Sequence, residues 1–219
     1  MFKTIYMTLP DGPDAYMGLT FYVNAMTRYA VDRSCGCLVD IYLESVCDDE
    51  TLMYIVERSK NLKHLRLGHY TGVSDGVLIE AVKMLPALEE VAIIICSFSV
   101  DTIEAIGHTC PPLKSFTLND IAPDYEYADA DNEEALAIAK SMPNLRTLQL
   151  IGTFMTNEGL KAILDGCPLL ESLDLRACFF IDLSGELGKK CEQIKYVRQP
   201  GDSTSDYNQV FSDLEQFSN

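Results

Sequence analysis

The stretch 61–93, NLKHLRLGHYTGVSDGVLIEAVKMLPALEEVAI, decides the fold. Apolar residues spaced as L-x-x-L-x-L start at Leu62, and the same spacing starts again at Leu88. Between the two, Ser74 precedes apolar residues at helical spacing, which is typical of the first turn of a helix. The stretch therefore predicts a strand, a loop, a helix and then the next strand.

The spacing recurs along the chain, and its copies start at Leu38, Leu62, Leu88, Leu113, Leu145, Leu170 and, in degenerate form, Ile194. Neighbouring starts lie 24 to 26 residues apart, except for the 32 residues from Leu113 to Leu145. This is the period of leucine-rich repeats. Residues of helix-capping type stand 14 residues before five starts, at Asp48, Ser74, Ser99, Asp131 and Thr156. We therefore predict an α/β leucine-rich-repeat solenoid, with a curved parallel sheet on the concave side and helices on the outer side.

The pattern divides the chain into three parts. Residues 1–37 are a flanking segment, with a strand near Ile5 and a helix whose apolar positions include Tyr22 and Met26. Residues 38–198 hold the repeats. Residues 199–219 begin with turn residues and continue with apolar residues at helical spacing, which predicts a helix that caps the array. A helix that binds a partner is the alternative for this tail.

The long step in the repeat marks an acidic insertion at 119–134, which holds seven acidic residues and no basic one. Insertions into a repeat become loops at one edge of the array. We interpret Asp124, Tyr125, Glu126 and Tyr127 as a contact loop for a basic protein partner. A solvated loop without a partner is the plain alternative.

The concave face is the usual binding surface of a solenoid. Because side chains alternate along a strand, the neighbours of the repeat leucines face that side. As candidates for binding a protein target we select Tyr42, His64, Arg66, Ile94, Thr117, Gln149, Ile151, Asp174 and Arg176. Simple solvation is the alternative for each of them.

Composition and motifs restrict the kind of partner. The chain has 219 residues and a formal net charge of −16, which disfavours nucleic acid and anionic membranes as partners. No nucleophile elbow or phosphate-binding loop is found, so we expect no enzyme activity and no cofactor. Most of the eight cysteines follow the repeat register and are expected to pack as thiols, and we expect no metal site. A cytoplasmic or nuclear location is expected, because no apolar run approaches the length of a membrane helix.

Several segments resemble plant F-box proteins with leucine-rich repeats, especially the short members of the Skp-interacting group. They are YAVDRSCGCLVDIYLE (29–44), RSKNLKHLRL (58–67), SDGVLIEAVKMLPALEE (74–90) and IEAIGHTCPPLKS (103–115). The segment FKTIYM (2–7) is similar to the one that comes after the F-box in that family. The resemblance covers roughly residues 2–198.

The resemblance implies a receptor subunit of an SCF-type E3 ubiquitin ligase, whose repeats hold the substrate while an F-box docks on a Skp adaptor bound to cullin. Such a receptor does no chemistry and acts by proximity. Since the chain begins where the F-box of the family ends, contact with Skp and cullin is expected only if an F-box is supplied upstream. The alternative is a stand-alone repeat protein, or a decoy that binds a target without recruiting the ligase.

Overall fold

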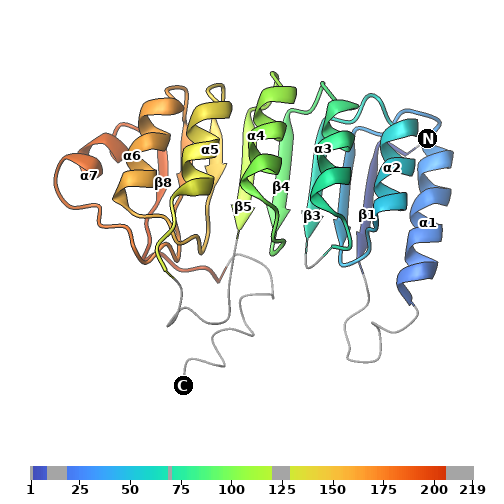
Figure 1. Cartoon of the computed structure of the whole chain (residues 1–219), viewed down its shortest axis with the longest axis horizontal. Coiled ribbons are helices and arrows are strands. Elements are labelled where there is room, and N and C mark those ends of the chain that lie inside the picture. The colour runs from blue at the N-terminus through green and yellow to red at the C-terminus, as the bar shows by residue number, and fades with distance from the viewer. Residues whose placement is uncertain (1, 9–18, 69–70, 120–128, 206–219) are drawn as a thin grey trace.

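The computed structural model describes residues 2–8, 19–68, 71–119 and 129–205. Its strands form one parallel sheet in which each strand pairs with its neighbour in chain order. The strands are β1 (Thr4–Thr8), β2 (Asp40–Glu44), β3 (His64–Gly68), β4 (Glu90–Ile94), β5 (Ser115–Asn119), β6 (Thr147–Gln149), β7 (Ser172–Asp174) and β8 (Tyr196–Arg198). Figure 1 shows the helices as a single row along one face of this sheet. The predicted repeat solenoid is confirmed.

One helix comes after each strand from β1 to β7. The helices are α1 (Leu19–Ser34), α2 (Asp49–Arg58), α3 (Asp75–Lys83), α4 (Val100–Thr109), α5 (Glu133–Ser141), α6 (Asn157–Gly166) and α7 (Glu186–Cys191). The sheet register places equivalent repeat positions side by side, so that Leu65 lies between Ile41 and Val91. These side chains are at most 1% exposed. The core is therefore a layer of stacked apolar side chains between the sheet and the helix row, and its burial drives folding.

The flanking segment is part of the same array. Strand β1 pairs in parallel with β2, and the Ile5 side chain is buried. Helix α1 forms as expected, but its buried positions include the polar residues Asn24 and Thr27. Tyr22 and Met26, which the apolar spacing selects, are 64% and 60% exposed. On the inward side, Asn24 Nδ2 donates a hydrogen bond to Asp48 Oδ2, at the start of the next helix, over 2.7 Å. Val23 and Ala30, which the apolar spacing also selects, pack against the core.

The predicted helix starts agree with the structure in four of five repeats. Asp48, Ser74, Ser99 and Thr156 are N-cap residues, whereas the N-cap position of α5 is Asn132, one residue after the predicted Asp131. The Asp131 side chain still accepts a hydrogen bond from the Glu133 N–H at the start of α5, at 2.9 Å. The Asn132 side chain bonds to the next repeat and not to α5. Asn132 Oδ1 accepts hydrogen bonds from the backbone N–H groups of Thr156 and Gly159, at 2.9 and 3.1 Å.

The cysteines at repeat positions pack into the stack, as their spacing predicts. Cys110, Cys167, Cys178 and Cys191 are at most 3% exposed, while Cys96 is half-buried. Burial raises the pKa of the Cys110 and Cys167 thiols to about 11. In the described ranges, no group of three or more His, Cys, Asp or Glu side chains is placed to hold a metal ion. None of the described helices is long and apolar enough to cross a membrane.

Candidate binding surface on the concave face

The concave face divides into two regions along the array. We call the side chains of Tyr6, Asp40, Tyr42, Glu44, His64, Arg66 and Glu90, from β1 to β4, the open patch. Each of them is exposed or half-buried. We call Thr117, Asn119, Ile151, Asp174 and Arg176, from β5 and the ends of β6 and β7, the closed patch, because each is at most 7% exposed.

An aromatic pair forms one end of the open patch. The rings of Tyr6 and Tyr42 lie 4.8 Å apart between centroids, tilted by 49°, and Tyr6 is 58% exposed. Tyr6 Oη donates a hydrogen bond to Glu44 Oε2 at 3.3 Å. A Cβ at Gly68 would lie 3.1 Å from Tyr42 Oη, so the glycine leaves the space that the Tyr42 ring uses. Partial burial and the neighbouring Glu44 raise the pKa of Tyr6, which keeps its phenol protonated.

A charged network crosses the middle of the open patch. Arg66 Nε lies 2.6 Å from Glu90 Oε1, and Arg66 Nη1 lies 3.0 Å from Asp40 Oδ1. His64 Nδ1 is 3.9 Å from the other oxygen of Asp40. The single guanidinium is thus bound by two carboxylates from the flanking strands. Because Glu44 adds a third carboxylate, the open patch has a net negative charge.

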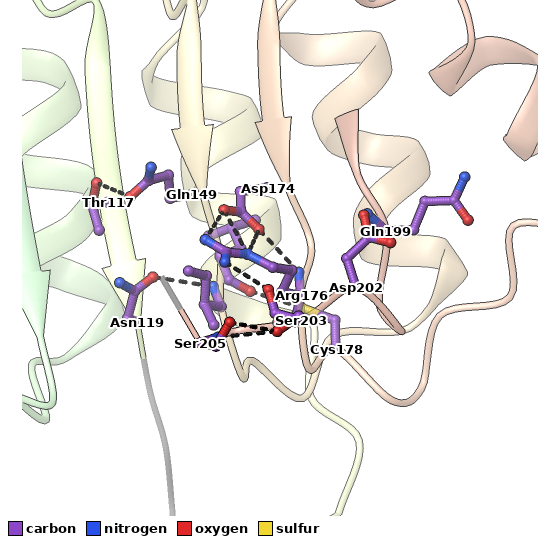
Figure 2. Close-up of polar contacts among 12 residues, drawn as sticks. Thr117, Asn119, Gln149, Asp174, Arg176, Cys178, Gln199, Asp202, Ser203 and Ser205 are labelled. Atoms are coloured by element: carbon purple, nitrogen blue, oxygen red, sulfur yellow. Dashed lines mark hydrogen bonds and ion pairs between the residues drawn. The ribbon is translucent and has the colours of Figure 1, made fainter. Parts of the chain in front are cut away.

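The closed patch centres on a buried ion pair, which Figure 2 shows at the ends of the strands. Arg176 Nη2 lies 2.7 Å from Asp174 Oδ2, and Arg176 Nε donates to Asp174 Oδ1 at 2.9 Å. Arg176 Nη1 also donates to the backbone carbonyl of Ser203 at 3.0 Å. The described start of the tail, 199–205, therefore returns to the concave side and contacts the guanidinium there.

The remaining polar groups of the closed patch bond to residues of the neighbouring repeat. Thr117 Oγ1 and Gln149 Oε1 are 3.3 Å apart, and Asn119 Oδ1 accepts from the Ile151 backbone N–H at 3.1 Å. These bonds join β5 to β6 and to the residues just after it (Figure 2). Ile151 is 0% exposed as a result of this packing.

The structure separates the predicted binding residues into two groups. Tyr42, His64, Arg66, Ile94 and Gln149 are half-buried on the concave side and offer surface to a partner. Thr117, Ile151, Asp174 and Arg176 are buried, which differs from the expectation that they are accessible, because each packs within the array. The acidic-loop candidates Asp124, Tyr125, Glu126 and Tyr127 lie outside the described residues, as does the predicted tail helix after Ser205. A role in binding stays a prediction for all of them.

The structure adds Tyr6 to the candidates. The sequence pattern starts the repeats at Leu38, so it marks β1 as a flank and selects none of its outward side chains. The signal is present in the alternation of Ile5, Tyr6 and Met7, which places Tyr6 on the face opposite to the buried Ile5.

Comparisons with known proteins agree with the repeat pattern. A family model described as the leucine-rich repeats of FBD-associated F-box protein At5g56370 matches residues 124–184. Three Arabidopsis thaliana proteins are similar over most of the chain. F-box/LRR-repeat protein 23 is 46% identical over 83% of this chain, F-box protein SKIP19 is 44% identical over 86%, and F-box/LRR-repeat protein 9 is 36% identical over 86%.

These relatives differ in length from the chain. It spans 40% of F-box/LRR-repeat protein 23, 61% of SKIP19 and 76% of F-box/LRR-repeat protein 9. Among solved structures, the leucine-rich repeat-containing protein LegL7 from Legionella pneumophila matches with a TM-score of 0.46 and 15% identity. That match covers 80% of this chain and 64% of the other.

Proposed function

This chain belongs to the F-box/LRR-repeat protein family, and from that premise we propose that its repeats hold a protein target for an SCF-type ubiquitin ligase. The target lies on the concave face, over the open patch. In this proposal the chain itself makes or breaks no bond. It positions the target so that a lysine comes near the charged ubiquitin carrier, which accelerates transfer by proximity.

The observation that carries the proposal is the uneven packing of the concave face. Solenoids use this face for binding because its side chains are not needed to hold the stack. That condition holds for the open patch, where Tyr6 is 58% exposed and His64 and Arg66 keep about a third of their side-chain surface. It fails for the closed patch, where Arg176 is 3% exposed.

Recruitment of the ligase is the finer part of the proposal. The names of the relatives carry the term F-box, and the family's F-box docks on a Skp adaptor and, through it, on cullin. We place this contact in an F-box joined upstream of the repeats, and we assign none of it to the open patch. Target binding and ligase recruitment are then separate properties, and each can be tested without the other.

The test is a pull-down from plant extract, read by mass spectrometry, with the chain as bait. A concave variant, Tyr6→Ser with His64→Ser, is compared with a convex variant, Glu80→Ser with Lys83→Ser. The convex variant removes an exposed ion pair of α3 with a 2.7 Å contact, and such pairs contribute little to stability. Circular dichroism verifies that both variants are folded.

We expect one reproducible protein to be retained by the wild type and the convex variant and lost from the concave variant. Retention of the same protein by the concave variant would reject the concave face as the target site. Recovery of a Skp adaptor with cullin by this chain alone would show that recruitment does not depend on an upstream F-box.

A further inference from the structure

We infer that the open patch binds an extended basic peptide, with one arginine or lysine side chain seated on the Tyr6–Tyr42 pair beside Glu44. This inference rests on the proposed function and adds the chemistry of the target segment. It excludes acidic segments, including phosphorylated ones, from the same surface.

Charge complementarity is the first reason. The open patch holds Asp40, Glu44 and Glu90 against Arg66. Arg66 is bound from both sides by Asp40 and Glu90, at 3.0 and 2.6 Å, so its positive charge is already matched. The formal charge of the whole chain is −16, and this field attracts cations to the face before contact.

The aromatic pair gives the cation a specific seat. Lysine and arginine heads bind over the face of a tyrosine ring at up to about 6 Å from its centroid. Tyr6 is more than half exposed, and its hydrogen bond to Glu44 holds the carboxylate next to the ring. A cation on this ring therefore meets a π face and a negative charge together. Glu44 is able to accept from Tyr6 and from the incoming donor, because a carboxylate has about four acceptor sites.

The neighbouring strands indicate which side chain the peptide carries beyond the cation. Glu44, Gly68 and Ile94 occupy the same row of the sheet. Since neighbouring strands lie about 4.8 Å apart, Ile94 is about 10 Å from Glu44, which an extended peptide covers in about three residues. The Tyr42 ring fills the space above Gly68, so the peptide crosses this ring on its way from Glu44 to Ile94, which offers an apolar contact. The expected segment thus has a basic residue and, about three positions away, an apolar one.

A titration monitored by NMR tests the inference on the whole chain. The probe is a short glycine–serine peptide that carries one arginine and one leucine three positions apart. Its control has citrulline in place of arginine, which keeps the shape and removes the charge. We expect the arginine peptide to shift the amide signals of Tyr6, Tyr42, Glu44 and Ile94, and the citrulline peptide to leave them unchanged.

Matched variants separate the ring from the charge. Tyr6→Leu is expected to weaken binding about two- to fivefold, the range of an exposed cation–π contact, while Tyr29→Leu on α1, also an exposed tyrosine, has no effect. Glu44→Gln is expected to weaken binding about two- to fivefold, as for an exposed ion pair. Asp101→Asn, which removes the same charge from the exposed start of α4, has no effect.

Several results would overturn the inference. They are equal binding of the citrulline peptide, shifts that fall outside the open patch and Ile94, or equal effects of the site variants and their controls. If the target captured from plant extract depends on the open patch while the arginine peptide does not bind, the proposed function stands and this inference fails. If the peptide binds as expected and no protein is captured, the surface chemistry is supported and the proposed function fails.

Discussion

At the residue scale, one position of the repeat has a left-handed backbone in four of the copies that the structure describes. Ser45, Ile95, Gly152 and Ala177 have φ angles between 54° and 75°. Each donates its backbone N–H to a carbonyl of the next repeat, as Ala177 does to Pro200 at 2.9 Å. The bond requires the chain to turn sharply after the strand. For residues other than glycine, this conformation is unfavourable by about 1–2 kcal/mol.

This cost predicts that Ala177→Gly stabilises the protein. The strain removed is about 1–2 kcal/mol, and the added entropy of the unfolded chain offsets about 0.5–1 kcal/mol, so a net gain of about 0.5–1 kcal/mol is expected. Ala162, inside α6, has a helical backbone without this strain, so Ala162→Gly is expected to lower the free energy of unfolding by about 0.5–1 kcal/mol. Urea unfolding measures both. Equal losses at the two positions would contradict the backbone argument.

A second prediction concerns Glu89, whose carboxylate joins Lys63 and Lys114 from the repeats on either side, at 2.5 and 3.1 Å. Hydrogen bonds from Lys63 and Lys114 lower its pKa from 4.5 to about 2. The folded pKa is below the unfolded one, so the stabilisation is complete above about pH 4.5 and is lost as pH falls toward about 2. The Tm of Glu89→Gln is therefore expected to lie below the wild-type Tm at pH 6.

That difference in Tm is expected to shrink below pH 4.5 and to vanish near pH 2. Scanning calorimetry or circular dichroism at a series of pH values measures it. In a Lys63→Met, Lys114→Met background, Glu89→Gln is expected to leave the pH dependence unchanged. A Tm difference that stays constant from pH 6 to pH 3 would show that these ion pairs do not cause it.

At the element scale, the helix starts are tied to one another across repeats. The first residue of a helix accepts hydrogen bonds from the cap of the next one: Asp49 from the Ser74 N–H at 2.7 Å, and Asp75 from the Ser99 N–H at 2.7 Å. Burial alone would raise the pKa of Asp75, but the hydrogen bonds from Ser99 and Thr102 outweigh it and lower the pKa. The caps thus fix the spacing of neighbouring helices as well as the start of each one.

Close approach of helices gives a prediction at this scale. A Cβ at Gly166, the last residue of α6, would clash with the backbone carbonyl of Ala139 in α5. Because backbone does not yield easily, Gly166→Ala is expected to lower the free energy of unfolding by about 1–3 kcal/mol. Gly76 is the control. Among the described atoms none lies within 4 Å of a Cβ placed there, so Gly76→Ala in α3 is expected to be neutral or stabilising by up to about 1 kcal/mol.

Urea unfolding of the two alanine variants decides the point. If Gly166→Ala and Gly76→Ala had the same free energy of unfolding, α5 and α6 would be able to move apart at no cost. The close packing of these two helices would then not restrict the residue at position 166. Since Gly166 lies on the helix row and far from the concave side chains, its variant is expected to lose stability without a change in peptide binding by the folded protein.

Most of the array is predictable from the sequence because its core repeats. Leu65 and Val91 occupy the same position of successive units, so one period determines their strands, their burial and their register. The orientation of α1 is not predictable from periodicity. Its apolar positions include the exposed Tyr22 and Met26, while Asn24 is buried and donates a hydrogen bond to Asp48. That bond depends on a residue of the next repeat, which no pattern within α1 contains.

At the scale of the whole molecule, the open and the closed patch of the concave face differ in role. Alternation within strands predicts correctly which side chains point to that face, and it treats all copies alike. It contains no sign that Ser203 returns to Arg176, because this contact depends on the path of the tail, outside the repeats. The result is an uneven face, on which Tyr6 of β1 and Tyr196 of β8 are 58% and 59% exposed while Arg176, just after β7, is 3% exposed.

This difference in burial between the open and the closed patch predicts opposite outcomes for two arginines of the same face. Arg176→Ala leaves Asp174 buried without its partner and is expected to cost about 3–5 kcal/mol of unfolding free energy. Arg66→Ala removes partly solvated pairs and is expected to cost about 1 kcal/mol or less. Equilibrium unfolding in urea measures both. The double variant Asp174→Leu, Arg176→Met is expected to recover much of the loss, because two apolar side chains leave no unpaired charge.

For peptide binding, we expect the opposite order: Arg66→Ala changes the affinity, whereas Arg176→Ala does not. Arg66→Ala frees Asp40 and Glu90 on the open patch and increases its negative charge, so the arginine peptide should bind more tightly than to the wild type. Folded Arg176→Ala protein should bind that peptide as the wild type does, since the closed patch offers no surface to it. NMR titration compares the two variants. If Arg176→Ala changed peptide binding while Arg66→Ala did not, the division of the concave face into an open patch that binds and a closed patch that is structural would be wrong.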